Sequence, residues 1–122
     1  MAGTVVTTEI TYPSSIKKVK FEWTSDASGD ADGSTTAVFS GKLVQVTTVP
    51  DGVAAPTADY DVEVRDADGV DLLAGAGADR HTSNTEHITS ASLGAVCASA
   101  LTLVVANAGN ATEGVVYVYI ET

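Results

Sequence analysis

The chain has few cysteines, few basic residues and no long apolar run. Cys97 is the only cysteine in 122 residues, so no internal disulfide can form and the fold does not depend on an oxidising compartment. Six Lys and Arg stand against sixteen Asp and Glu, which gives a formal net charge of -10. This charge repels phosphate backbones and anionic lipid, so we expect neither nucleic acid nor a membrane as partner.

No apolar stretch is long enough to span a bilayer, and the first residues lack the basic flank and apolar core of a secretory signal. The chain is therefore expected to be made in the cytoplasm without processing. Its length predicts one domain, residues 1–122, and its abundance of Thr, Val, Ala, Ser and Gly is typical of short strands and tight turns.

Two stretches near the C-terminus show the period-two alternation of strands. The apolar residues on one face of Leu101–Ala106 and of Val115–Ile120 are Leu101, Leu103, Val105, Val116, Val118 and Ile120. This pattern predicts a strand pair joined through residues 107–114, with these side chains as the floor of a core. Because two strands are not stable alone, the rest of the chain is expected to supply more strands and a second layer.

Further strand signals complete an all-β fold. Ile16–Thr24 and Tyr60–Arg65 alternate cleanly, whereas Thr4–Tyr12 alternates poorly and is expected to be an edge strand or part of an extended arm over residues 1–13. The signals together predict a single-domain antiparallel β-sandwich, jelly-roll or Greek-key-like, with about eight strands.

The connections carry their own signals. Residues 26–33 are polar and Gly-rich, which predicts a loop. In Thr35–Val49, Ser40-Gly41 is either a tight turn or a bulge within one bent strand, and we favour two strands that meet there. Asp66–Gly69 predicts a hairpin turn followed by a short return strand at Val70–Ala74. Ser83–Glu86 has the spacing of a capping box, which predicts a short helical turn near residues 83–90. Residues 91–100 remain ambiguous between strand and loop.

Candidate chemical sites are few, and we assign no catalytic residue, no metal and no cofactor. Calcium would suit an Asp- and Gly-rich loop, but the residues of this loop do not match the EF-hand spacing: Asp26, Ser28, Asp30, Asp32 and Gly33. His81, Ser83 and His87 are residue types of hydrolytic chemistry, yet no nucleophile-elbow motif accompanies them. Cys97 has no basic neighbour in sequence to lower its pKa, which favours a small buried side chain.

Two groups of residues are candidates for an interface. Lys17, Lys18 and Lys20 concentrate basic charge on an acidic chain, either as protection against edge aggregation or as a docking face for an acidic protein surface. On the C-terminal strands, the face opposite the core carries Val104, Tyr117 and Tyr119 together with Thr102. This face is apolar for a surface in water, so another element or a neighbouring subunit is expected to cover it.

Four segments, Ile16–Ser25, Ala55–Gly69, Leu72–Arg80 and Leu101–Gly109, resemble small β-rich proteins encoded among the virion structural genes of tailed bacteriophages. The likeness extends over nearly the whole chain and points to head decoration, or cement, proteins. It implies a protein without enzymatic activity that binds the outer surface of the major capsid protein lattice and stabilises the head, located on the capsid surface of the virion. It also implies a homo-oligomer, with a trimer favoured.

The resemblance suggests how the chain would bind. A Thr-rich N-terminal arm including Thr4, Val5 and Val6 would add a strand to an exposed edge of the capsid. The alternatives are a carbohydrate-binding or adhesive β-sandwich of the virion surface or tail, or another head–tail component. A third hypothesis is a small hydrolase that uses His81, Ser83 or His87.

Overall fold

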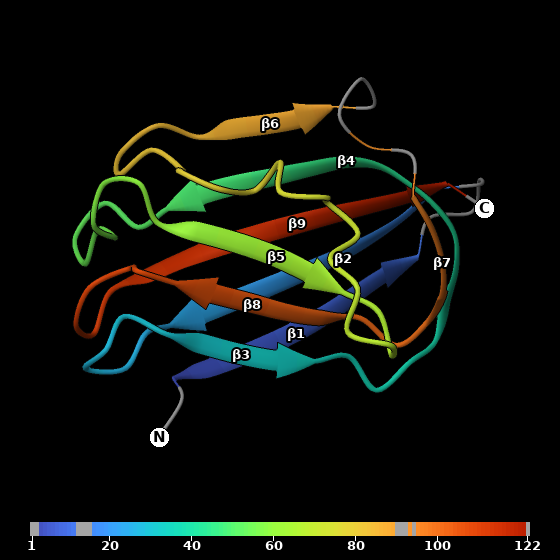
Figure 1. Cartoon of the computed structure of the whole chain (residues 1–122), viewed down its shortest axis with the longest axis horizontal. Coiled ribbons are helices and arrows are strands. Elements are labelled where there is room, and N and C mark those ends of the chain that lie inside the picture. Colours follow the sequence, from blue (N-terminus) through green and yellow to red (C-terminus); the bar gives the residue numbers. More distant parts are fainter. Residues whose placement is uncertain (1–2, 12–15, 90–92, 94, 122) are drawn as a thin grey trace.

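Two antiparallel sheets packed face to face make up the molecule (Figure 1). The computed structural model describes residues 3–11, 16–89, 93 and 95–121. These residues form nine strands and no helix, which confirms the predicted all-β sandwich and adds one strand to the expected number. No described segment is a helix of the length and hydropathy that crossing a membrane requires.

The larger sheet contains six strands and the smaller sheet three. In the larger sheet the order is β1 (Thr4–Thr11), β2 (Ile16–Thr24), β9 (Glu113–Glu121) and β4 (Phe39–Pro50), followed by β6 (Glu86–Thr89) and β7 (Val96–Ser99), which both pair with β4. In the smaller sheet the order is β3 (Ala31–Ser34), β8 (Thr102–Ala106) and β5 (Asp61–Arg65).

The core lies between the sheets and consists of the residues that alternate toward it. On β2 these are Val19, Phe21 and Trp23, and on β9 they are Val116, Val118 and Ile120, all fully or almost fully buried. The smaller sheet contributes Leu103 and Val105 from β8 and Val62 and Val64 from β5. The predicted inward-facing residues of these strands are therefore confirmed.

The predicted pairing of the two C-terminal strands is wrong. β8 pairs with β3 and β5, whereas β9 pairs with β2 and β4, so the two strands face each other across the core (Figure 1). Their connection crosses from one sheet to the other and is held by backbone and side-chain bonds, among them Ser25 Oγ to Gly109 O at 2.6 Å. Alternation shows which side of a strand is apolar but not which strand lies beside it.

Tertiary pairing also overrides two local predictions. The end of the polar stretch 26–33 belongs to β3, because Ala31 is buried and pairs with Val105 of β8. The expected break at Ser40-Gly41 is absent: β4 runs from Phe39 to Pro50, and its irregularity is a bulge between Leu43 and Gln45. Gly41 permits the continuous strand, since a Cβ there would clash with the backbone of Glu121.

The predicted helical turn near residues 83–90 is also wrong, because Glu86–Thr89 is strand β6. The capping-type bonds do form, but His81 takes the role expected of Ser83. His81 Nδ1 accepts the N–H groups of Ser83 at 3.0 Å and Asn84 at 2.9 Å, while Glu86 Oε1 accepts the His81 N–H at 2.8 Å. Since β6 pairs with β4 immediately afterwards, the reciprocal bonds close a loop instead of starting a helix.

The hairpin at Asp66–Gly69 is present, with Gly69 N bonded to Asp66 O at 3.1 Å. Its return is an isolated bridge between Arg65 and Asp71 and not a strand over Val70–Ala74. At the N-terminal end, Thr4–Thr11 pairs with β2 over its full length. Of the two alternatives for this segment, the structure has the edge strand, and residues 1–2 and 12–13 of the expected arm lie outside the described residues.

Candidate functional site

The outer face of the larger sheet gathers lysines, tyrosines and a polar network. Because β2 and β9 turn their odd and even residues respectively toward the core, Lys18 and Lys20 lie outward beside Tyr119 and Tyr117, their cross-strand partners. On β4, Gln45 extends the Lys18–Tyr119 row and Thr47 extends the Lys20–Tyr117 row. His87 of β6 pairs with Thr47 and completes the second of these rows. We call this surface the lysine–tyrosine face, made of Lys18, Lys20, Gln45, Thr47, His87, Tyr117 and Tyr119.

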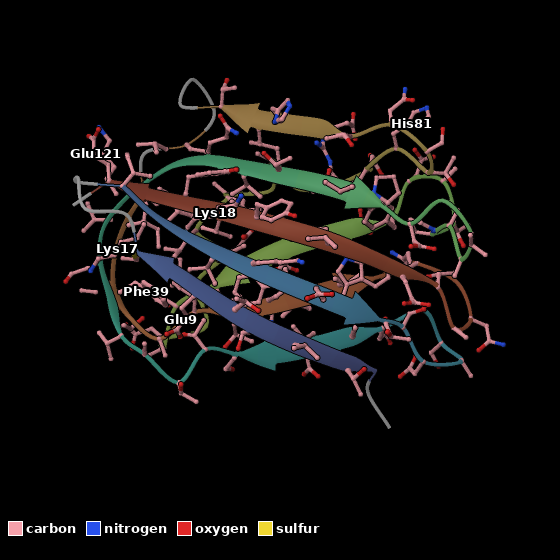
Figure 2. All side chains as sticks on the ribbon, turned by 180° about the vertical axis from the view of Figure 1, so that it is seen from behind. Glu9, Lys17, Lys18, Phe39, His81 and Glu121 are labelled. Carbon is pink, nitrogen blue, oxygen red and sulfur yellow. The ribbon has the colours of Figure 1, made fainter. Side chains whose placement is uncertain are left out.

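Lys18 lies on the β2 side of the lysine–tyrosine face and extends toward the tyrosines of β9 (Figure 2). Its ammonium group lies 4.3 Å from the ring centroid of Tyr117 and 5.6 Å from that of Tyr119. Both distances are within the range of a cation–π contact. Lys20 Nζ is 3.4 Å from Glu22 Oε1 and pairs with that carboxylate. Of these two lysines, Lys18 is therefore the one that contacts the tyrosine rings.

On the side of the tyrosines away from β2, side chains of β4 and β6 form a hydrogen-bonded row. Gln45 Nε2 donates to Thr47 Oγ1 at 3.0 Å, and Thr47 Oγ1 lies 2.9 Å from His87 Nδ1. Thr47 is only 5% exposed although it faces outward. Sequence reasoning missed this row, because the β4–β6 register that aligns it depends on residues forty positions apart; the alternation of Gln45 and Thr47 was the only local signal.

The outer face of the smaller sheet is acidic. Asp61 and Glu63 of β5 and Asp32 of β3 surround Val104 and Ala106 of β8. Arg65 bonds Glu63 at 3.1 Å, and this carboxylate raises the pKa of the Arg65 guanidinium. Val104 therefore lies on the opposite side of the sandwich from Tyr117 and Tyr119, and the single apolar patch expected from these three residues does not exist.

The remaining interface candidates are also divided. Lys17 has the core-facing parity of Val19 and lies at the end of the sandwich, separated from Lys18 and Lys20. Thr4 and Val6 face outward near the β1 edge, whereas Val5 turns inward and packs against Gly33 of β3. The structure thus brings together Lys18, Lys20, Tyr117 and Tyr119 but leaves out Lys17, Val5 and Val104.

The residues of the hydrolase hypothesis do not form a relay. His81 Nδ1 is 3.3 Å from Ser83 Oγ, but the same nitrogen already accepts two backbone N–H groups. The Glu86 carboxylate accepts the His81 backbone N–H and is not bonded to the His81 ring. His87 is part of the lysine–tyrosine face, bonded to Thr47, and does not join His81. A nucleophile activated by a base that a third group orients is not present among these residues.

Loop aspartates use their carboxylates to build turns. Asp26 Oδ1 accepts the N–H groups of Ser28 and Asp30, Asp66 Oδ1 those of Asp68 and Val70, and Asp51 Oδ2 those of Val53 and Ala54. These backbone bonds lower the pKa of Asp26 and Asp51 below the ordinary value. Within the described residues, no group of three His, Cys, Asp or Glu side chains is arranged to hold a metal ion.

Buried polar side chains lie in the core and not in an open site. Burial raises the pKa of the Cys97 thiol, which is 1% exposed, and this disfavours the nucleophilic thiolate. Burial likewise raises the pKa of Tyr60 to about 12. The Tyr60 hydroxyl, Thr48 Oγ1 and Trp23 Nε1 have no hydrogen-bond partner of regular geometry among the described residues. Trp23 and Tyr60 pack ring against ring at 5.6 Å.

Compared with known proteins, the chain matches no family model, no curated sequence and no solved structure. The lysine–tyrosine face is therefore interpreted from its own geometry and chemistry.

Proposed function

We propose that the chain is a structural protein of a bacteriophage virion, a decoration or cement protein that binds the outer surface of the major capsid protein lattice. The observation that carries this proposal is the chemical difference between the two outer faces of the sandwich. One face presents the lysine–tyrosine surface, and the other presents Asp32, Asp61 and Glu63.

The lysine–tyrosine face has the composition of a protein-binding surface. Tyrosine is enriched in interfaces, and Lys18 and Lys20 add positive charge suited to an acidic patch on a partner. The acidic face would then point to solvent. Binding of this kind needs no active site, since a protein that binds only the assembled shell stabilises that shell by mass action. Many copies on a repeating lattice strengthen a weak contact.

The binding surface in this proposal is the face of the sheet and not a free N-terminal arm. Thr4–Thr11 is integrated into the larger sheet through pairing with β2. Removal of β1 would therefore expose the edge of β2 and the inward side of Phe21 and Trp23, which Thr7 and Val5 pair with.

One observation favours glycan binding as a second candidate. Tyr117 and Tyr119 lie side by side on an open sheet face next to the polar row Gln45, Thr47 and His87, and carbohydrate sites combine aromatic rings with such groups. Against it, the Lys18 ammonium lies over the Tyr117 ring, where a sugar would stack.

The proposal is tested by locating the chain in purified particles. Heads and tails of a virion carrying this chain are separated, and the chain is quantified in each by mass spectrometry. A decoration protein is recovered with heads at a fixed ratio to the major capsid protein. Recovery with tails, or binding of the isolated chain to a glycan array, would reject the proposal in favour of the adhesive alternative.

A further inference from the structure

Three polar side-chain atoms lie in the core without a regular hydrogen-bond partner among the described residues. They are Trp23 Nε1, Thr48 Oγ1 and the Tyr60 hydroxyl, and each of the three residues is at most 1% exposed. A polar atom that is taken out of water and finds no partner inside the protein destabilises the fold. Such atoms are rare in folded proteins, so a group of three requires a physical explanation.

Two of these atoms belong to neighbouring positions on the core side of the larger sheet. The indole of Trp23 on β2 reaches across to β9, where Nε1 lies 3.0 Å from the position that a Cβ on Gly114 would take. Thr48 of β4 pairs with Val116 of β9, which makes it the diagonal neighbour of Gly114. Aromatic side chains can reach a diagonal neighbour on the same face of a sheet. The edge of the indole that carries the N–H is thereby brought to the strand that carries Thr48.

Tyr60 approaches the same end of the core from the smaller sheet. It immediately precedes β5, and its ring centroid lies 5.6 Å from that of Trp23. Burial raises the pKa of Tyr60 to about 12, and the neighbouring Thr48 hydroxyl opposes this rise as a hydrogen-bonding group. The two hydroxyls are thus close to each other, although they do not form a regular bond. Polar groups from both sheets therefore meet beside the indole of Trp23.

We propose that Trp23 Nε1, Thr48 Oγ1 and the Tyr60 hydroxyl bind one buried water molecule. Water fits these groups because an indole N–H only donates, whereas a hydroxyl both donates and accepts. The water accepts from the indole N–H and bonds the two hydroxyl oxygens, which gives it the three bonds typical of a buried water. A cation would meet the donating N–H of Trp23, and an anion would find no opposite charge on these three neutral groups.

This water joins the two sheets of the sandwich. Trp23 and Thr48 belong to the larger sheet, whereas Tyr60 is next to β5 of the smaller sheet. The contacts across the rest of the core are apolar, and apolar contacts do not fix direction in the way that hydrogen bonds do. The water site is a property of the core and does not depend on the function that the outer faces serve.

The first test removes one hydroxyl at a time from the full chain. Thr48→Val keeps the shape of the side chain, and together with Tyr60→Phe it is expected to show an unfolding equilibrium constant about tenfold higher than the wild type, because each change takes a partner from the water. Tyr119→Phe removes a hydroxyl from the outer face and is expected to stay within about twofold of the wild type. Urea denaturation measures all three variants. If Thr48 Oγ1 were unpaired, Thr48→Val would equal or exceed the wild type in stability, and this result would overturn the proposal.

A second test separates a bound water from a direct bond between the two hydroxyls, which would also be lost in these variants. A high-resolution crystal structure of the wild-type chain is expected to show one ordered water within about 3.2 Å of Trp23 Nε1, Thr48 Oγ1 and the Tyr60 hydroxyl. In crystals of Thr48→Val this water is expected to be displaced or absent. A wild-type crystal in which other waters are ordered but the two hydroxyls bond each other directly, with no water at the indole N–H, would overturn the proposal.

Discussion

The indole of Trp23 lies directly against the backbone of Gly114 on the neighbouring strand β9. This close contact is possible because glycine has no side chain. The two residues are cross-strand partners, and a Cβ on Gly114 would lie 2.6 Å from Trp23 Cζ2. The indole is rigid and fully enclosed, since Trp23 is 1% exposed and packs against Tyr60. The close packing at this end of the core therefore depends on a residue without a side chain.

Gly114→Ala is expected to lower the free energy of unfolding by about 1–3 kcal/mol, the usual cost of overpacking a core. Gly52→Ala is the control, because nothing lies within 4 Å of a Cβ at that position. Its effect is expected to stay within about 0.5 kcal/mol. Urea denaturation of both variants checks the prediction, and equal stability of the two would contradict the contact with Trp23.

Asp51 links stability to pH through its turn. The N–H groups of Ala54 and Val53 bond its carboxylate and hold its pKa below the ordinary value of 3.8. Because the folded-state pKa is depressed, this stabilisation is present above the unfolded pKa and is lost as the pH falls through the folded pKa. Asp26 acts in the same direction.

The protein is therefore expected to lose thermal stability below about pH 4. Asp51→Asn keeps an acceptor oxygen for both N–H groups and is expected to show a weaker acid dependence, whereas Asp51→Ala is expected to be less stable at every pH. Melting temperatures at neutral and acidic pH measure this. If the melting temperature of Asp51→Asn fell as steeply with decreasing pH as that of the wild type, Asp51 would not be a source of the loss of stability in acid.

At the scale of elements, each strand is organised by its two faces. On β8, Leu103 is fully buried between the sheets, while its neighbour Val104 faces outward and is half-buried. The same alternation separates Phe21 from Lys20 on β2 and Val118 from Tyr117 on β9. Of two adjacent residues in one strand, one therefore faces the core and the other faces the outer surface of the sandwich.

Leu103→Ala is expected to destabilise the fold by about 2–5 kcal/mol, because it opens a cavity between the sheets. Val104→Ala, one position along the strand, is expected to cost less than about 1 kcal/mol. Chemical denaturation compares the two. A cost for Val104→Ala as large as that of Leu103→Ala would mean that the outer face of β8 is covered.

At the scale of the whole molecule, the sandwich separates charge between its two outer faces. Lys18→Gln and Arg65→Gln each remove one positive charge, the first from the lysine–tyrosine face and the second from the acidic face. Under the proposed function, Lys18→Gln is expected to weaken head binding by about tenfold, because it also removes the contact with the tyrosine rings, while Arg65→Gln leaves binding unchanged. Co-sedimentation with heads measures both, and equal effects would show that only net charge matters.

What the amino-acid sequence determined by itself is the face of each strand. Alternation at Val19, Phe21 and Trp23, or at Leu103 and Val105, is a local property, and it predicted the core and the all-β fold correctly. Lys18, Lys20, Tyr117 and Tyr119 were likewise recognisable as outward-facing residues.

Only the tertiary structure decided which strands are neighbours. β8 and β9 were expected to pair but belong to opposite sheets, which separates Val104 from Tyr117, and the partner of His87 is Thr47 on a strand forty residues earlier. The stretch that ends in β3 and the capping-box signal at Ser83 give wrong local predictions for the same reason, since pairing with β8 and β4 outweighs local propensity. Side-chain period depends on neighbours two residues apart, whereas strand order depends on backbone bonds between distant segments, and no local pattern encodes these bonds.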